Sequence, residues 1–439
     1  MPRLRPLLAL LLLAACVTDP VTGRREYSLT SWSPERERAV GAEEGPGLEV
    51  ELDGILADAQ AQAVVQSILD EIVALSPRRE ELEFQITVLA SSEPNALALP
   101  GGYVYLTRGM LAEIESEAEL VSILGHEIGH VEHRHSMTGG SKGALIGLPA
   151  IPFEWLGGVL PIGGNIVGFA GGVLRAPSKL VNLKYSREHE LQADRRGAYY
   201  SYELGYDPRE LMRAFDRGYN SKRSSILGTH PTDDERRDRF ERLIREQYPD
   251  VLEREADTFR GTSEEVASLM RRARREVSAY ENWEDARALL AAGEEGDLDL
   301  AWTSLVLALN EVPNEPLFWI LSGEISLERE DIGGAWLSFL RAEALYRDAV
   351  GERGHWKPPF YLGVIDLGRE RYERSRDRFL IAVERYAENA ALRYYLGLAQ
   401  EGSGEPSAAR KSYERALELE TGDPELRAAI KARLRTLSS

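Results

Sequence analysis

Apolar positions along the chain recur mostly with helical spacing, and strand-like patterns occur in two short segments. Apolar side chains fall every three or four residues over 61–75, which predicts an amphipathic helix. Apolar and polar side chains alternate over 84–88, which predicts a strand. A second strand-like run over 102–106 follows the turn signal Pro100-Gly101. The pattern therefore predicts an α+β fold that is mostly α, with a small β-sheet near the N-terminal end.

Helix signals follow the second predicted strand. Thr107 can open a short helix, and Ser116 with Glu119 has the spacing of a capping box at the start of another. A polar helical pattern resumes near Tyr185 and runs past Tyr199. These signals predict a helical domain around the sheet.

One pattern of small and large side chains repeats along the last third of the chain. Its period is 34 residues, with a middle step that is six residues longer. The small, large and small positions of the four units are Ala301, Leu305 and Ala308; Ala335, Phe339 and Ala342; Ser375, Phe379 and Ala382; and Ala409, Tyr413 and Ala416. Paired helices can approach closely at such positions, so the pattern resembles tetratricopeptide repeats stacked into an α-solenoid. The alternative is a generic helical bundle in which this register is accidental.

The N-terminus has the pattern of a secretory signal. Two arginines precede an apolar run over 7–15 that is too short to span a bilayer stably. The run ends at Cys16, the only cysteine in the chain, in a segment that resembles a bacterial lipobox. This resemblance implies cleavage before Cys16 and acylation of its thiol. In a Gram-negative cell, Val17 in place of Asp after that cysteine implies an outer-membrane anchor facing the periplasm. The alternative is an ordinary signal peptide with an incidental cysteine.

Changes in composition divide the chain into four segments. We expect a signal peptide over 1–15, a tether with little regular structure over 16–47, a first folded domain over 48–260 and the repeats over 261–439. An apolar insert rich in Gly and Pro spans 139–174. Its prolines argue against a continuous membrane span, so we expect a lid or plug near the functional site rather than a membrane hairpin.

Length and charge limit the classes of function. The 439 residues are too many for one ordinary core, so we expect at least two domains. The formal charge of -19 argues against nucleic acid as a partner and against loose adsorption to anionic lipid.

The segment His126-Glu127-Ile128-Gly129-His130 contains candidate metal ligands and a candidate catalytic base. Residues four apart stack on one face of a helix, so both imidazoles can reach a single metal ion. Glu127 projects beside that face, where it can act as the general base for an attacking water. Two imidazoles and one further protein ligand form a common site for a catalytic Zn²⁺, so we expect one zinc ion per chain.

A second helix can supply the third ligand. Glu190 and Asp194 are again four residues apart. Glu190 could bind the metal, and Asp194 could accept the free ring N–H of a ligand histidine. The alternative is a solvated acidic helix face, since acidic pairs at this spacing are common there.

Four motifs together resemble the gluzincin family that contains HtpX and the CAAX prenyl proteases. They are the stretch 95–105, the helix 126–130, the segment 190–194 and Thr229-His230-Pro231. The soluble periplasmic branch, the beta-barrel assembly-enhancing proteases, also carries C-terminal tetratricopeptide repeats. The resemblance implies a zinc metalloendopeptidase with His126, His130 and Glu190 as ligands and Glu127 as base. It also implies a regulatory role at the metal for His230, and a supporting role for Arg236.

An exposed sheet edge can hold an extended substrate through backbone hydrogen bonds. We expect that edge between residues 96 and 106, with Asn95, Ala96, Gly102 and Tyr103 as substrate contacts. The remaining histidines are expected to be structural or on the surface. On a continuing helix His133 and His135 would turn away from the ligand face, His189 would be solvated, and His355 lies between repeats.

Two hypotheses follow for the function. In the first, the chain is a periplasmic zinc endopeptidase, anchored by lipid to the outer membrane, that cleaves unfolded or misassembled envelope proteins and docks on outer-membrane assembly machinery through its repeats. In the second, it is a non-proteolytic periplasmic chaperone or adaptor that binds through the repeats alone.

Overall fold

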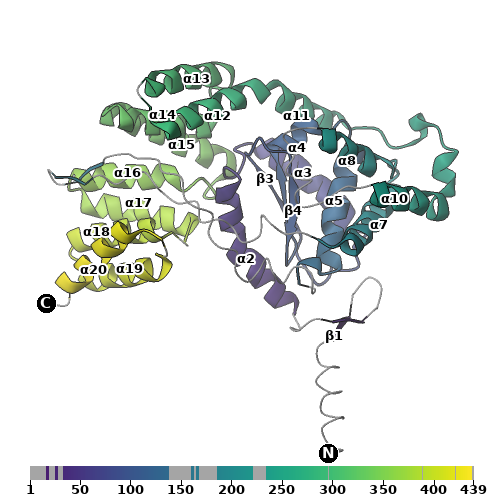
Figure 1. Cartoon of the computed structure of the whole chain (residues 1–439), viewed down its shortest axis with the longest axis horizontal. Coiled ribbons are helices and arrows are strands. Elements are labelled where there is room, and N and C mark those ends of the chain that lie inside the picture. Colours follow the sequence, from purple (N-terminus) through teal and green to yellow (C-terminus); the bar gives the residue numbers. More distant parts are fainter. Residues whose placement is uncertain are drawn as a thin grey trace, which may run out of the picture. The chain divides into compact units, whose positions relative to one another are not determined.

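The computed structural model describes residues 33–137, 185–220, 234–294, 296–387, 389–420 and 422–437, and strands at 16–18, 25–27, 160–162 and 165–167 (Figure 1). Internal contacts divide the chain into two units. The N-terminal unit consists of Met1–Leu52, Ala59–Pro149 and Ser178–Arg275. The C-terminal unit consists of Asp53–Asp58, Ala150–Pro177 and Glu276–Ser439.

The N-terminal unit combines helices with a small sheet. Its elements are β1 (Cys16–Thr18), β2 (Arg25–Tyr27), α2 (Pro34–Glu51), α3 (Ala59–Val73), β3 (Gln85–Leu89), β4 (Ala96–Leu99), β5 (Tyr103–Thr107), α4 (Arg108–Glu113), α5 (Glu117–Glu132), η1 (His135–Met137), α7 (Arg187–Glu203), α8 (Glu210–Asn220), α10 (Asp234–Gln247), η2 (Pro249–Leu252), η3 (Ala256–Thr258) and α11 (Glu264–Arg275). The predicted α+β class, mostly α with a small sheet, is confirmed.

The main sheet has the order β3-β5-β4, with β3 parallel and β4 antiparallel to β5. Its β3 edge is closed by side chains of α3. Gln62 Nε2 donates to the Val88 carbonyl at 2.9 Å, and Gln62 Oε1 accepts from the Val88 N–H at 2.9 Å. Gln66 Oε1 likewise accepts from the Ile86 N–H at 3.0 Å. Of the two edges of the described sheet, β4 is therefore the one whose backbone N–H and C=O groups are not hydrogen-bonded by glutamine side chains of a helix.

Part of the predicted substrate edge is wrong. Ala96 lies on the edge strand β4, and Asn95 directly precedes it. Tyr103, however, begins the central strand β5 and pairs with both neighbours, and Gly102 lies in the turn before it with φ +96°. The strand-like run 102–106 is largely buried on both faces of β5, and the sequence pattern alone does not distinguish such a central strand from an edge strand.

The tether predicted over 16–47 is also wrong in its second half, because α2 is an 18-residue helix there. Its glycines, which indicated a linker, are packing contacts. A Cβ atom at Gly41 would lie 2.4 Å from the ring of Tyr103. One at Gly45 would lie 2.5 Å from the hydroxyl oxygen of Tyr105. The helix is therefore held by close approach to β5 rather than by an amphipathic pattern.

The C-terminal unit is a stack of helices. Its elements are β6 (Leu160–Ile162), β7 (Asn165–Val167), α12 (Val277–Ala292), α13 (Asp297–Glu311), α14 (Pro316–Glu328), α15 (Ile332–Val350), α16 (Lys357–Gly368), α17 (Tyr372–Arg385), α18 (Ala390–Gly402), α19 (Pro406–Leu419) and α20 (Pro424–Thr436). The predicted boundary at residue 261 falls before α11, which packs on α3 and α4, so contacts place α11 with the N-terminal unit.

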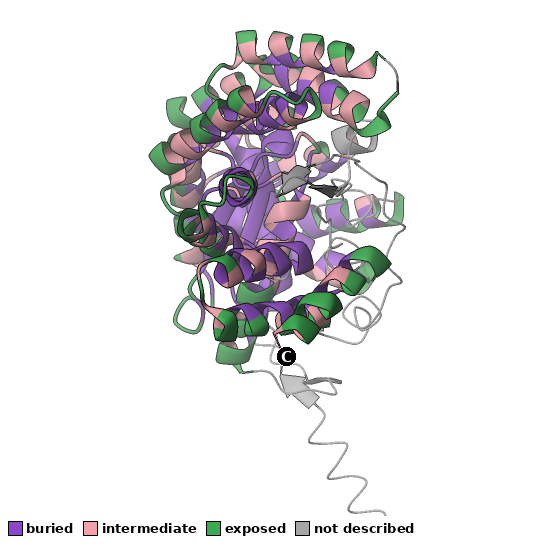
Figure 2. Cartoon of the chain, turned by 90° about the vertical axis from the view of Figure 1, so that its left-hand side faces the viewer, coloured by how far each residue is buried: buried purple, intermediate pink, exposed green. Residues whose placement is uncertain are grey.

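Consecutive helices pair as α12–α13, α14–α15, α16–α17 and α18–α19, and α20 packs on α19. The small and large positions of the repeat are buried in all four pairs. In the last three pairs, the large aromatic residue packs on a glycine of the first helix. A Cβ atom would lie 2.5 Å from Phe339 at Gly323, 2.8 Å from Phe379 at Gly363 and 2.4 Å from Tyr413 at Gly397. The repeat register is thus a set of helix–helix contacts, as predicted. Figure 2 shows buried (purple) and exposed (green) residues alternating along the same helices.

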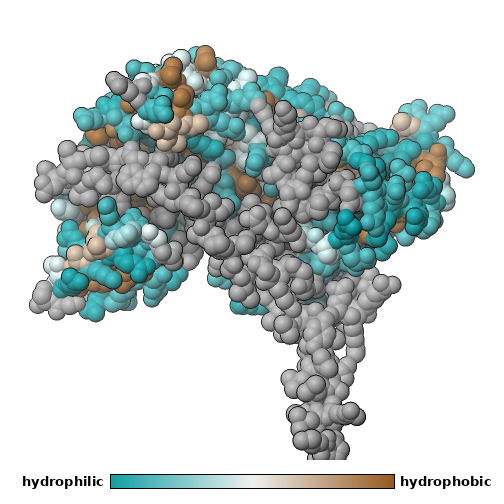
Figure 3. All heavy atoms as spheres, in the orientation of Figure 1, coloured by the Kyte–Doolittle hydropathy of each residue, from teal (hydrophilic) through white to brown (hydrophobic). Residues whose placement is uncertain are grey.

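The outer surface of the repeats carries several apolar side chains. The exposed large apolar residues of α13, α15 and α17 are Leu300, Leu307, Leu337, Leu340, Leu380 and Ile381. Brown spheres near α13 mark apolar side chains on an otherwise hydrophilic surface (Figure 3). Single exposed apolar residues of this kind are normal and assign no partner.

Several predictions fall outside the described residues. These are the signal peptide, His230 and most of the insert 139–174, of which only β6 and β7 are described. For Cys16 the structure describes the backbone strand alone. Among the helices that the structure describes, none is long and apolar enough to cross a bilayer.

His355 should make the stability of the C-terminal unit depend on pH. Its Nδ1 accepts the Lys357 N–H at 3.1 Å, which requires an unprotonated Nδ1. Burial, then the charges of Lys357 and Arg385, lowers the pKa of His355 well below its usual 6.5. The unfolded chain takes up a proton near pH 6.5 that the folded chain does not, so the stabilisation is present above that pH and is lost as the pH falls below it.

This dependence can be measured by urea unfolding at about pH 7.5 and about pH 5.5, on either side of the ordinary histidine pKa. The wild-type chain should lose more stability between the two conditions than a His355→Gln variant. Equal losses would contradict the assignment.

Candidate metal centre

Two closely packed helices, α5 and α7, carry the candidate site. Ser116 caps α5 by accepting the Glu119 N–H at 3.2 Å, as the capping signal predicted. A Cβ atom at Gly129 of α5 would lie 3.0 Å from the Cα atom of Ala193, and one at Gly197 of α7 would lie 2.9 Å from a carbonyl oxygen of α5. These glycines let the two backbones approach, which brings the acidic turn of α7 against the histidines of α5.

A buried carboxylate also ties the end of α5 to α7. Glu132 accepts hydrogen bonds from Ser76 Oγ at 2.6 Å and from Arg196 Nε at 2.5 Å. The Tyr200 hydroxyl donates to the same carboxylate. This network fixes the C-terminal end of the helix on which both histidines lie.

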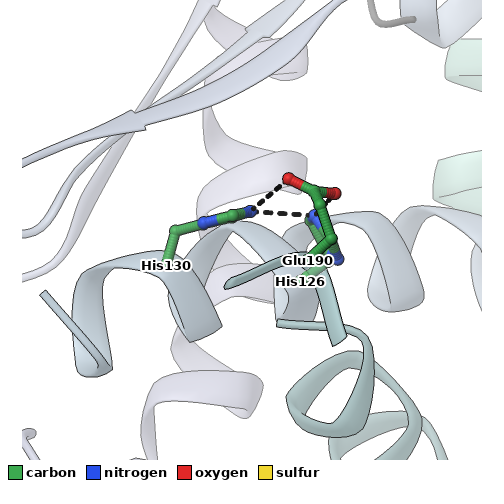
Figure 4. Close-up of side chains that lie close together, drawn as sticks. All are labelled: His126, His130 and Glu190. Atoms are coloured by element: carbon green, nitrogen blue, oxygen red, sulfur yellow. Dashed lines mark hydrogen bonds and ion pairs between the residues drawn. The ribbon is translucent and has the colours of Figure 1, made fainter. Parts of the chain in front are cut away.

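His126, His130 and Glu190 converge on one point (Figure 4). The two Nε2 atoms of the histidines are 3.0 Å apart. Glu190 Oε2 lies 3.6 Å from His126 Nε2, and Glu190 Oε1 lies 3.6 Å from His130 Nε2. These three side chains and Glu127 are each at most 2% exposed.

The donor set fits a tetrahedral metal ion. Metal–ligand distances of about 2.1 Å at tetrahedral angles put neighbouring ligand atoms about 3.4 Å apart, close to the distances found here. Charge supports the same conclusion. Among the described residues of the centre, Glu127, Glu190 and Asp194 are buried with Arg236, so three carboxylates and one guanidinium give a formal net charge of -2. Burying such a charge is costly unless a cation compensates it, and a divalent ion does so.

Asp194 and Arg236 contact the ligand side chains His126 and Glu190 and hold them in place. Asp194 Oδ1 lies 3.0 Å from His126 Nδ1, so it can accept that ring N–H and leave Nε2 directed at the centre. Arg236 Nε and Nη2 donate to Asp194 at 2.8 and 2.7 Å, and its Nη1 lies 2.8 Å from Glu190 Oε2. Burial alone would raise the pKa of Asp194, but the charge and hydrogen bonds of Arg236 outweigh it and hold that pKa well below the usual range.

The expectation for His135 is wrong. Helix α5 ends at Glu132, and Arg134 adopts φ +56°, so the chain turns back instead of continuing as a helix. His135 is therefore buried with Nδ1 2.9 Å from Nδ1 of His130. His189 is partly buried, and its ring stacks on His135 with centroids 4.3 Å apart. His133 is buried, and its ring also stacks with that of His135, at 5.3 Å.

Two aromatic residues at the site were missed from the sequence. The ring of Tyr185 stacks on His130 with centroids 3.9 Å apart, and burial followed by the charges of Glu127 and Glu190 raises the pKa of Tyr185 well above its usual 10. Phe215 of α8 lies edge-on to the ring of His126 at 5.5 Å. A helical pattern on α8 predicts a buried face, but no sequence signal indicates which site that face lines.

Comparison with known proteins agrees with this geometry. Residues 59–244 match the sequence profile of peptidase family M48. The chain is 32% identical over 176 residues to the putative beta-barrel assembly-enhancing protease of Vibrio cholerae, covering 38% of this chain and 35% of that protein. It is 27% identical over 190 residues to the beta-barrel assembly-enhancing protease of Escherichia coli K12, covering 40% and 37%. It is also 27% identical over 165 residues to the mitochondrial metalloendopeptidase OMA1 of Arabidopsis thaliana, covering 36% and 31%.

The chain thus spans about a third of the length of these relatives. Among solved structures, a thermophilic TPR protein of Thermus thermophilus aligns with a TM-score of 0.30 at 20% identity, covering 36% of this chain and 82% of that one. At this score, the repeat assignment rests on the helix pairs described above. The resemblance that the sequence motifs indicated agrees with this match: residues 59–244 carry a domain similar to peptidase family M48.

Proposed function

We propose that the chain is a zinc-dependent endopeptidase of the cell envelope that hydrolyses unfolded or misassembled proteins. The observation that carries this proposal is the buried set of His126, His130 and Glu190, with Glu127 on the same helix. Two imidazoles and one carboxylate form a donor set typical of catalytic zinc in peptidases.

A zinc ion bound there would supply Lewis acidity toward water and a peptide carbonyl. The chain's own residues would handle the protons. Glu127, next to His126, is the group to take a proton from the attacking water and to deliver it to the leaving amine. Asp194 keeps His126 in the tautomer that directs Nε2 at the centre. Tyr185, with its raised pKa, remains a neutral hydroxyl near both glutamates.

The substrate would bind as an extended strand along β4. The arrangement of the sheet supports the choice of β4, because side chains of Gln62 and Gln66 already bond to the opposite edge strand, β3. Pairing through backbone groups demands little of the substrate sequence, which suits a peptidase for unfolded clients. Because the site residues are at most 2% exposed, we infer that a polypeptide reaches them only after part of the chain moves. His230 is proposed to take part in that restraint.

The envelope setting is proposed on two grounds. The N-terminus resembles a lipoprotein signal with Cys16 as the acylated residue. The bacterial relatives are named as proteases that enhance beta-barrel assembly. We propose a periplasmic location, an outer-membrane lipid anchor and repeats that dock on assembly machinery.

A non-proteolytic chaperone or adaptor is the second candidate, favoured by the stack of helix pairs, which offers an extended binding surface. Hydrolysis of an unfolded, fluorescently labelled protein by the purified mature chain separates the two. If the chain is a zinc peptidase, we expect it to cleave this substrate, and we expect a chelator to abolish the cleavage and stoichiometric zinc to restore it. Chaperone activity without cleavage, in a zinc-loaded protein, would favour the adaptor.

A further inference from the structure

The two histidines of the centre are held by different partners. His126 has the carboxylate of Asp194 at its Nδ1, whereas His130 has the imidazole of His135. In a neutral imidazole one ring nitrogen is a donor and the other an acceptor, so the partner at Nδ1 decides whether Nε2 is free to bind a metal. The partner of His130 is therefore part of what makes the centre competent.

His135 can act only as the acceptor in this pair. Its Nε2 lies 2.8 Å from the Gln192 amide oxygen and donates to it. A neutral ring with its proton on Nε2 accepts at Nδ1, which lies 2.9 Å from His130 Nδ1. His130 then carries its proton on Nδ1, and the lone pair of its Nε2 points to the metal position that it shares with His126 and Glu190.

A neutral partner also suits the charge of the centre. In the described part of the chain, three buried carboxylates already lie at the metal position with one guanidinium. A fourth carboxylate at His130 would raise the buried negative charge beyond what one divalent ion compensates. An imidazole orients the ligand without adding charge.

The N-terminal helix α2 fixes the turn that places His135. Arg134, in the left-handed conformation, donates from Nε to Glu37 Oε1 at 2.8 Å. Glu37 is 1% exposed, and it also makes a bidentate pair with Arg78 at 2.9 and 3.0 Å. Arg78 in turn donates to the carbonyl of Val131, in the last turn of α5, at 2.9 Å. The carboxylate of α2 thus holds both sides of the turn.

We propose that His135 is a positioning residue that sets the tautomer of His130, and that Glu37 of α2 couples the docking of the N-terminal helix to the metal centre. The relay runs from Glu37 through Arg134 to His135 and His130. It rests on the proposed function in that His130 must be a metal ligand. It adds that a helix within the range predicted as membrane tether influences metal binding.

Zinc affinity of the full chain, measured by competition with a chromophoric chelator, tests this. His135→Leu keeps much of the volume of the ring but removes the acceptor, and His135→Asn keeps an acceptor near the Nδ1 position. Loss of an orienting partner typically weakens metal binding 10–100-fold. We expect a weakening of about 10–100-fold in His135→Leu, with much of it recovered in His135→Asn, and a changed visible spectrum of the Co²⁺-loaded His135→Leu protein.

The coupling to α2 is tested by Glu37→Gln, with Glu35→Gln as the matched control because Glu35 lies on the exposed side of the same helix. Only Glu37→Gln should weaken zinc binding. Thermal unfolding of the metal-free variants identifies any that fail to fold. If one does, the comparison of Asn with Leu at 135 is made on folded protein at lower temperature.

Two results are decisive. Equal zinc affinity and an unchanged Co²⁺ spectrum in His135→Leu would overturn the inference while leaving the proposed function intact. A wild-type chain that binds no zinc would overturn both.

Discussion

A Glu127→Gln chain should bind zinc like the wild type and hydrolyse peptide bonds about 10²–10⁴-fold more slowly, the range typical for loss of a general base. Glu127 lies beside His126 but outside the converging donor set, so its removal should leave the metal position intact. Turnover of an unfolded protein substrate and zinc content, measured on the same preparation, check both halves of this expectation.

The matched control is Glu119→Gln, since Glu119 lies on the same helix but accepts a hydrogen bond from the Glu115 N–H near its start. Its turnover should stay close to that of the wild type. A Glu127→Gln protein that keeps wild-type turnover would rule out Glu127 as the base, and one that loses its zinc would place Glu127 among the ligands.

Replacing Arg236 by Met should destabilise the N-terminal unit by about 3–5 kcal/mol, because it leaves two buried carboxylates without their cation. Arg236 is 5% exposed and contacts both Glu190 and Asp194. Urea unfolding in the presence of a chelator measures this effect without a metal. Arg237→Met, which removes a neighbouring and far more exposed ion pair, should cost at most about 1 kcal/mol.

The Arg236 effect should also depend on pH. Asp194 has a pKa held below its usual 3.8 in the folded chain, so the stabilisation is present above that pH and is lost as the pH falls below it. The wild type and Arg236→Met should therefore converge in stability in acid. Stabilities that differ by the same amount at all pH values would show that Arg236 acts through packing on Phe215 rather than through its charge.

The sequence predicted the chemistry of this chain better than its packing. The spacing of His126 and His130, and of Glu190 and Asp194, fixes which side chains share a helix face, so the structure brings them together as expected. The repeat positions were also predictable, because a recurring pattern of small and large side chains indicates where two helices pack against each other.

The wrong predictions for the tether and for His135 share a physical reason. Gly41 and Gly45 predicted a flexible tether, yet they form contacts with a strand more than fifty residues away. His135 was misplaced because nothing local in the sequence marks the end of α5 at Glu132. That end depends on the left-handed turn at Arg134, which Glu37 of a distant helix holds. In both cases tertiary contacts override a local pattern.

The most direct test of the account is the metal content of the purified mature chain, measured by mass spectrometry of the elements. We expect one zinc ion per chain in the wild type and a large loss of zinc in His130→Ala, with the folded state of both verified by circular dichroism. A folded wild-type chain that takes up no zinc, or a His130→Ala chain that keeps it, would contradict a metal centre built from His126, His130 and Glu190.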